Sequence, residues 1–268
     1  MNIKTTLLVS VEKIALKSKY LLREVQLDIY TPQMEASESL ELLLINDGQD
    51  LPKMPFDEIL NDLYSQKLIK PFIAVGIYCG EDRKMEYGMV SATDYLGRGA
   101  KAGLYNQFIL EELIPFLLKN YNITHQEKIS FAGFSLGGLC ALDIVWNYPQ
   151  FFYRVGVFSG SLWWRSIDQD DVTYDDDKHR LMQQQIRNTN YKPGLKFFFQ
   201  CGLMDEKKDR NHNGVIDAVD DTRDHVRELI KKGYTLEDVT YMELDEGRHD
   251  VPSWAKAFPA FLKWGWGL

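Results

Sequence analysis

Cysteine is scarce in this sequence of 268 residues, and no apolar run is long enough to cross a membrane. The three cysteines, Cys79, Cys140 and Cys201, are odd in number, and their spacings fit no zinc or redox motif. We expect buried free thiols rather than disulfides, which favours a reducing, cytoplasmic compartment. The apolar patch near the N-terminus is followed at once by charged residues and has no small-residue cleavage site, so it does not resemble a signal peptide.

Positive charge is also in short supply. Lys and Arg number 31 against 39 Asp and Glu, which gives a formal net charge of -8 at pH 7. An acidic chain is repelled by phosphate backbones, so we expect no nucleic-acid partner. Hydrophobic residues make up 45% and charged residues 26%, as in ordinary globular proteins. No linker, repeat or low-complexity tract interrupts the chain, so we expect one domain over residues 1–268.

Short apolar runs alternate with segments of helical periodicity along most of the chain. Such runs are typical of strands buried on both faces, and the alternation predicts an α/β fold, with a mostly parallel central sheet and helices on both faces. The N-terminal segment 7–32 alternates polar and apolar residues and is expected to form antiparallel strands at the sheet edge. The predicted buried strands are 41–47, 71–78, 128–134, 154–160, 195–202 and 239–244, and the predicted helices are 106–121, 135–148, 220–234 and 252–266.

The segment 162–194 departs from this rhythm because it is long and polar, with the runs DQDD and YDDDKHR. Its sequence predicts an insertion that is partly helical near HRLMQQQIRN. Long insertions in α/β enzymes often cover the active site. A lid-like roof and a solvated surface excursion are both compatible with this composition.

The stretch FAGFSLGGL, residues 131–139, places Ser135 between two glycines where a predicted strand ends and a predicted helix begins. This strand–turn–helix context is what the G-x-S-x-G nucleophile elbow requires. Side chains at Gly133 and Gly137 would clash in so tight a turn, and the helix N-terminus supplies N–H groups for an oxyanion. An ordinary Gly-rich turn is the alternative. The context favours Ser135 as a nucleophile.

A serine nucleophile needs a base and an acid. After an elbow of this kind, the acid follows the serine along the chain and the histidine follows the acid. Of the five histidines, His125 precedes the serine, whereas His249 lies between the last predicted strand and the last predicted helix. We therefore predict His249 as the base. The acid should follow the strand 195–202, where Asp205 comes first and Glu206 next, and we prefer Asp205.

Two further features complete the predicted active site. The Leu136 backbone N–H is one expected oxyanion donor, and the loop INDGQD, in which Gly48 permits a turn, offers the N–H of Gln49 as the other. The pair Trp163–Trp164 follows FSGS at the end of a strand beside the nucleophile strand. We predict that at least one of these tryptophans lines the substrate pocket, with core packing as the alternative.

From about residue 25 to its C-terminus, the chain resembles the putative-esterase group of α/β-hydrolases, which includes enterochelin esterases, feruloyl esterases and S-formylglutathione hydrolases. The resemblance is carried by INDGQ, AVGIYCGEDRKMEYG, FILEELIPFLLKNY, FAGFSLGGLCAL, FSGSLWW, CGLMD and GRHDVPSW. It implies an α/β-hydrolase fold and a triad on Ser135, Asp205 and His249. Arg83 with Glu86 and Tyr87, and the double tryptophan, are most similar to the siderophore-esterase branch.

A second motif lies in the loop after the acid. DRNHNGVIDAVD, residues 209–220, fits a calcium-binding EF-hand loop, with glycine at its sixth position and a predicted helix after it. An Asn/Asp/Gly-rich turn that binds nothing is the alternative. The expected structural calcium ion would take its ligands from Asp209, Asn211, Asn213, Val215, Asp217 and Asp220.

These features predict a serine hydrolase that cleaves a small-molecule carboxylic ester through an acyl-enzyme. Siderophore-type esters and carbohydrate-linked aromatic or acetyl esters are the candidate substrates. Two alternatives remain: an acyltransferase on the same scaffold, in which an alcohol replaces water, and a non-catalytic binding domain. No organic cofactor and no membrane partner are expected.

Overall fold

The central sheet of the molecule has eight strands among the residues that the computed structural model describes, which are 9–33, 40–123 and 128–268. The strand order is β1-β2-β4-β3-β5-β6-β7-β8. β1 pairs with β2 and β2 with β4 in antiparallel fashion, and the other neighbours are parallel. The strands are β1 Val9–Ser18, β2 Arg23–Pro32, β3 Glu41–Asn46, β4 Phe72–Ile77, β5 Ile129–Phe134, β6 Phe152–Phe158, β7 Lys196–Gly202 and β8 Val239–Leu244.

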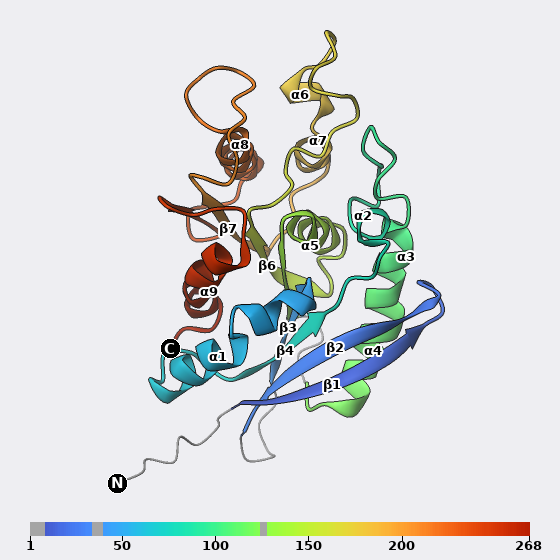
Figure 1. Ribbon diagram of the computed structural model, residues 1–268, viewed down its shortest axis with the longest axis vertical. Helices are drawn as coiled ribbons and strands as arrows, with labels where there is room; N and C mark the ends of the chain where they lie inside the picture. The colour runs from blue at the N-terminus through green and yellow to red at the C-terminus, as the bar shows by residue number, and fades with distance from the viewer. Residues whose placement is uncertain (1–8, 34–39, 124–127) are drawn as a thin grey trace.

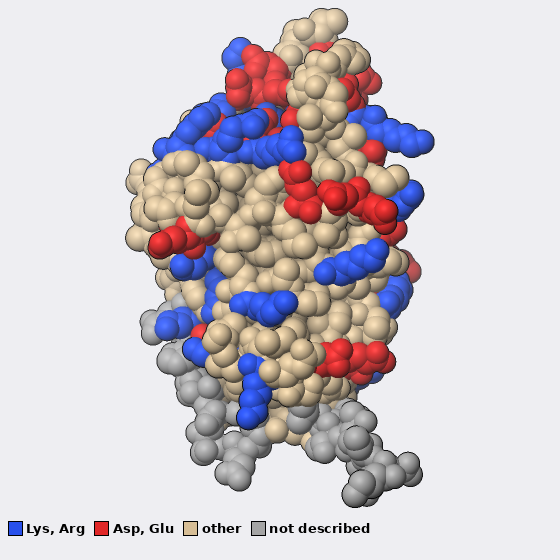
Figure 2. Space-filling view, turned by 90° about the vertical axis from the view of Figure 1, so that its left-hand side faces the viewer, with Lys and Arg blue, Asp and Glu red and all other residues tan. Residues whose placement is uncertain are grey.

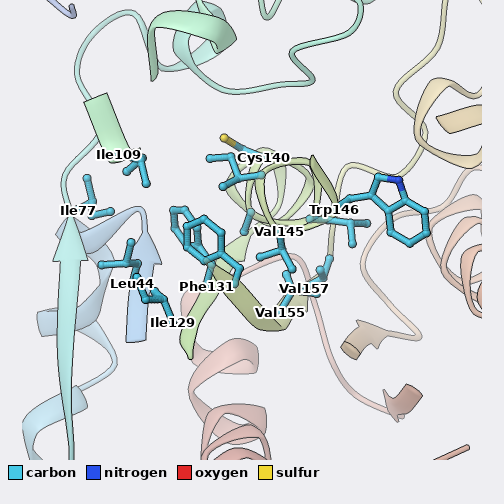
Figure 3. Close-up of a cluster of buried hydrophobic side chains, with 14 of the residues drawn as sticks. Leu44, Ile77, Ile109, Ile129, Phe131, Cys140, Val145, Trp146, Val155 and Val157 are labelled. Atoms are coloured by element: carbon cyan, nitrogen blue, oxygen red, sulfur yellow. The ribbon is translucent and has the colours of Figure 1, made fainter. Parts of the chain in front are cut away.

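Helices cover both faces of this sheet (Figure 1). One face packs against α1 Phe56–Ser65 and α9 Val251–Trp266, through a cluster that includes Phe56, Phe134 and Phe258. The other face packs against α3 Ala102–Gln107, α4 Ile114–Asn120, α5 Leu136–Asn147, α7 Leu181–Asn188 and α8 Asp217–Lys232. Figure 3 shows this second cluster, to which the sheet contributes Leu44 and Phe131 and α5 contributes Val145 and Trp146. The predicted α/β-hydrolase fold is confirmed.

The six predicted buried strands lie within two residues of their expected bounds. The run 106–121 begins earlier than predicted, because α3 continues through the π-helical turns η2 Phe108–Leu113 into α4. Three short elements were not predicted: η1 Gly48–Lys53, α1 and α2 Arg83–Glu86. The first and last are too short for periodicity to reveal, since each spans at most two turns.

The insertion 162–194 contains α7, in the segment predicted to be helical, and the short helix α6 Asp176–His179, which was not predicted. Met182 and Ile186 of α7 are fully buried against the main core, whereas the polar stretch before α6 is exposed. The segment is therefore anchored at its C-terminal half. In Figure 1 it lies at the same end of the molecule as the loop that precedes α8.

Candidate active site

Ser135 stands on a strained turn between β5 and α5. Its backbone angles are φ 54° and ψ -122°, which a residue with a Cβ adopts only when its surroundings hold it there. The N–H of Ser135 donates to the Phe158 carbonyl of β6 at 2.9 Å, and the Ser161 N–H donates to the Ser135 carbonyl at 3.0 Å. A side chain at Gly133 would collide with the backbone of Gly137, as the motif predicts. The half-buried hydroxyl therefore stands at the N-terminus of α5.

The two predicted oxyanion donors lie in different elements, Leu136 in α5 and Gln49 in η1. Leu136 is the first residue of α5, so its N–H has no partner inside the helix. Gln49 lies in η1 directly after β3, with its side chain held by Asp47 and by the Cys79 N–H. The turn that Gly48 was expected to permit is present, but the positive φ of 61° lies at Asp47. Gly48 is needed for another reason: a Cβ there would collide with the Gly76 backbone of β4.

Asp205 and His249 lie on two turns that pack backbone against backbone. A Cβ at Gly202 would collide with the Gly247 carbonyl, and the Met204 N–H donates to that carbonyl at 2.9 Å. This contact brings His249 Nδ1 to 3.8 Å from Asp205 Oδ2. The Asp205 carboxylate is 1% exposed, while the His249 side chain is 42% exposed and reaches solvent. The buried acid and the accessible imidazole thus meet at the edge of the sheet where β5 also ends.

The other candidates for acid and base lie elsewhere. Asp250 caps α9 by accepting a hydrogen bond from the Ser253 N–H at 3.0 Å, so it is committed to the helix. His225 is fully buried on α8, where burial lowers the pKa of its imidazole to about 4. No hydrogen bond joins Ser135 Oγ to His249 in the described part of the chain; such bonds are often long before substrate binds. His125 lies outside the described residues.

The two tryptophans have different environments. Trp164 is fully buried, its indole N–H donates to the Ala92 carbonyl at 3.3 Å, and its ring fills the space left by Gly88 and Gly99. Trp163 lines a cavity of about 250 Å³, whose walls also include Glu206, the residue after Asp205. Of the pair, Trp164 therefore fits the alternative of core packing, and Trp163 is the one that borders a pocket.

A family model described as "Putative esterase" matches residues 18–264. The chain belongs to the putative esterase family. Membership makes the protein a carboxylic ester hydrolase, as the sequence predicted. It is also similar to the "Uncharacterized protein YbbA" of Bacillus subtilis (strain 168), at 24% identity over 251 residues that cover 89% of this chain and 91% of that protein.

Solved structures agree with the fold of this esterase. The enterobactin esterase FES from Shigella flexneri, crystallised in the presence of enterobactin, gives a TM-score of 0.75 at 19% identity. That match covers 96% of this chain but only 58% of the Shigella chain. A ferulic acid esterase gives a TM-score of 0.72 at 17% identity and covers 96% of this chain and 97% of its own. At these identities the likeness establishes the fold. Within the described residues, no helix is both long and apolar enough to span a membrane.

Sequence reasoning missed two arginines that line the pocket beside Trp163. Each has an acidic partner, since Arg98 pairs with Asp94 and Arg165 with Asp168. The Arg98 guanidinium lies 4.9 Å from the centroid of the Trp163 ring, and that of Arg165 lies 5.5 Å from it. Arg165 is 9% exposed, and its Nε has no hydrogen-bond partner. Tyr95 and Lys208 complete the basic and aromatic part of the lining. Arginines spaced 67 positions apart leave no motif, so only the fold could reveal this arrangement.

The loop 209–220 closes on itself. Asn211 and Asn213 donate their side-chain amides to Asp220 Oδ2 at 3.1 and 2.6 Å, and Asp209 accepts from the Gly214 N–H at 2.9 Å. Asp217 instead accepts from the Arg210 N–H at 2.8 Å. Across the described residues, no group of three or more His, Cys, Asp and Glu side chains is arranged to hold a metal ion. The predicted calcium site differs from such a group, because it also takes ligands from the side-chain amides of Asn211 and Asn213 and from the backbone carbonyl of Val215.

Arg210 also ties this loop to the insertion. Its guanidinium donates to Asp176 Oδ1 at 2.7 Å and to Asp221 Oδ1 at 2.6 Å, and Arg180 donates to the same Asp221 oxygen at 2.6 Å. Figure 2, which views the molecule from the side on which α8 and α9 lie, shows acidic and basic side chains next to one another near the upper end. Ion pairs thus cross-link the insertion, the loop and α8.

Proposed function

We propose that this esterase cleaves its substrate with Ser135 as nucleophile, His249 as base and Asp205 as the acid that orients His249. The Ser135 hydroxyl would pass its proton to His249 as Oγ attacks the ester carbonyl carbon. His249 would then protonate the departing alkoxide, which leaves an acyl group on Ser135. Water would attack that acyl group and give a proton to His249. His249 would pass this proton to Ser135 Oγ as the bond to the acyl group breaks, which releases the acid and restores the free serine. The observation that carries this proposal is the strained Ser135 turn at the same sheet edge as the Asp205–His249 pair.

The charge that develops on the carbonyl oxygen needs donors placed in advance. We assign this role to the backbone N–H groups of Leu136 and Gln49. The partial positive charge at the N-terminus of α5, a helix of 12 residues, favours an anion at the same place. The strain in the Ser135 backbone supports this assignment, since sparsely populated backbone angles cluster at functional sites.

From the pocket beside Trp163 we infer a substrate that has an aromatic group and a negative charge. Arg98 and Arg165 lie over the Trp163 ring, and the Arg165 Nε is buried with no partner. A buried guanidinium donor without an acceptor is costly, and an anionic group of the substrate would supply that acceptor. Of the candidate substrates, siderophore-type aryl esters fit this chemistry better than neutral acetyl esters. The Shigella relative was crystallised with enterobactin, which is consistent with this choice.

We also propose a structural calcium ion in the loop 209–220. Positions three, five and twelve already meet at one carboxylate oxygen, because the amides of Asn211 and Asn213 converge on Asp220. Rotation of each amide by half a turn would present its oxygen instead of its nitrogen. Oxygen ligands of this kind suit Ca²⁺. The ion would stabilise the loop that follows Asp205 and take no part in bond cleavage.

The triad is tested by Ser135→Ala, with hydrolysis of p-nitrophenyl butyrate as the measurement. Loss of a triad nucleophile should lower kcat on the order of 10⁶-fold, as in another serine hydrolase. A fluorophosphonate probe should label wild type at Ser135 and leave the variant unlabelled, and circular dichroism should show that both are folded. A folded variant that keeps a tenth of the wild-type turnover would exclude Ser135 as the nucleophile.

A further inference from the structure

The residue before the oxyanion loop is held in an unfavourable conformation. Asp47 follows β3 directly, is buried, and adopts the left-handed region at φ 61° and ψ 43°. This region is unfavourable for a residue with a side chain, so the surroundings must compensate for it. Because Gln49 is only two residues away, any relaxation at Asp47 would move the N–H that we assign to the oxyanion hole.

Arg83 supplies that compensation. From the first position of α2, its Nε and Nη2 each donate to the Asp47 carboxylate at 2.7 Å, in the two-pronged geometry that fixes both position and orientation. Burial acts to lower the pKa of Arg83, but the Asp47 carboxylate outweighs burial and the pKa is raised. Nη2 also lies 3.4 Å from the carbonyl of Phe134, the residue before Ser135. One guanidinium therefore contacts both the residue that begins the Gln49 loop and the end of the strand that leads to Ser135.

Because Asp47 is negatively charged, its pairing with Arg83 has an electrostatic role as well as a structural one. Asp47 Oδ2 would lie 2.5 Å from a Cβ at Gly137, so the carboxylate is packed against the first turn of α5. An unpaired negative charge at that place would oppose the negative charge that forms on the substrate oxygen. Arg83 neutralises it.

A second ion pair, Arg23–Glu86, also involves the short helix α2 but does not contact the proposed oxyanion site. Arg23 Nε and Nη2 donate to Glu86 at 2.9 and 2.7 Å, and the Glu86 carboxylate is as buried as that of Asp47, with 2% exposed in each. This pair joins α2 to the hairpin of β1 and β2, away from β3 and β5. It has the same chemistry and burial with a different location, and is therefore an internal control.

We propose that Arg83 and Asp47 are positioning residues for the oxyanion hole. Their two-pronged ion pair fixes the Gln49 N–H relative to the Leu136 N–H and cancels the charge of the carboxylate beside α5. The proposal rests on the function proposed above, since it presupposes that the ester oxygen lies between these two donors. It concerns transition-state stabilisation, so it predicts an effect on kcat with little effect on KM.

The test compares Arg83→Met, Arg83→Lys, Asp47→Asn and the double variant R83M/D47N with Arg23→Met and Glu86→Gln. The probe is p-nitrophenyl butyrate, and urea unfolding gives the folded fraction of each variant.

R83M should lower kcat about 100-fold, the effect of losing one oxyanion donor, and leave KM within about threefold. R83K should restore little, because an ammonium cannot reproduce the two-pronged contact. The double variant should turn over faster than R83M, because it no longer carries the unpaired carboxylate. R23M and E86Q should lose stability but keep kcat within about threefold of wild type.

The proposal is overturned if R83M keeps its kcat, if its KM rises while kcat stays, or if E86Q and R23M lower kcat as much as R83M does at equal folded fraction. If R83M does not fold, R83K and D47N provide the same comparison with Glu86→Gln. Ser135→Ala is assayed in the same series. Turnover by folded Ser135→Ala would refute the proposed function, whereas an inactive Ser135→Ala beside a fully active R83M would refute the positioning role alone.

Discussion

The turn around Ser135 and the loop around Asp205 lie at the same edge of the sheet but are held in place by different interactions. Gly133 and Gly137 bring strand and helix into direct backbone contact, and almost every residue of β5 and α5 is buried. The chain from Asp205 to α8 is mostly exposed and polar, and it is held by Arg210, Asp176 and Asp221. Packing holds the first region, and ion pairs and backbone hydrogen bonds hold the second.

This difference teaches where the protein is sensitive to its surroundings. Close packing responds little to salt or pH, whereas ion pairs near a surface are screened and titrate. The nucleophile should therefore keep its geometry under conditions that loosen the loop and the insertion. Four predictions test this contrast, beginning with the one of largest effect.

Asp205 is the residue of the second region that we propose to act in catalysis. Asp205→Asn should lower kcat about 10⁴-fold, the loss seen when the acid of a serine-protease triad becomes an amide. Glu206→Gln should leave kcat within about tenfold, because Glu206 lines the pocket and has no contact with His249. Steady-state hydrolysis of p-nitrophenyl butyrate measures both. A silent Asp205→Asn with an inactive Glu206→Gln would reverse the two roles.

Substitution of the two adjacent tryptophans should separate an effect on substrate binding from an effect on protein stability. Trp163→Ala should raise KM for a negatively charged aryl ester about tenfold, since it removes the ring beneath Arg98 and Arg165. Trp164→Ala should lower the free energy of unfolding by about 3–5 kcal/mol, because it empties a fully buried site. Urea unfolding and KM measurements on both variants check this, and the reverse pattern would assign the pocket to Trp164.

Calcium should act on stability more than on catalysis. The Met204 N–H already holds the Asp205 turn against Gly247, so we expect added Ca²⁺ to raise Tm by about 5 °C over chelator-treated protein, with kcat changed less than about twofold. Asp209→Ala should abolish that increase, and the exposed Asp170→Ala should retain it. Thermal melts with and without chelator decide the matter. Equal melts of wild type in the two buffers would show that the loop is a simple turn.

Two buried groups should give opposite responses to acid. On α8, burial lowers the pKa of His225 to about 4, so only the unfolded chain takes up that proton as the pH falls below 6.5, and stability decreases. On α5, burial raises the pKa of Asp143 to about 6, so the folded chain takes up that proton first between pH 6 and 3.8, and stability increases. Each effect is on the order of 1–2 kcal/mol between pH 7 and 5.

Urea unfolding at pH 7 and pH 5 separates these two contributions. His225→Gln should lose less stability on acidification than wild type, and Asp143→Asn should lose more. Identical pH dependence in wild type and both variants would contradict the assigned titrations.

Sequence alone predicted what depends on local pattern. The elbow followed from glycine spacing between a strand and a helix, and the buried strands followed from their apolar runs, because both signals lie within about ten residues. The left-handed backbone at Asp47 was not predicted, because the cost of its conformation is offset by Arg83, 36 positions away. The meeting of Arg98 and Arg165 at the Trp163 ring escaped notice for the same reason, since 67 positions separate the two arginines.

The backbone contact between Gly202 and Gly247 also bears on how the chain can evolve. It fixes Asp205 and His249 at the roots of their turns, within a few residues of β7 and β8. The residues from 207 to 216 extend beyond that root, and most of them are solvent-exposed. Insertions and deletions there would alter the rim of the pocket while the pair stays in register. New specificities could thus arise by changing loop length alone, without rebuilding the catalytic machinery.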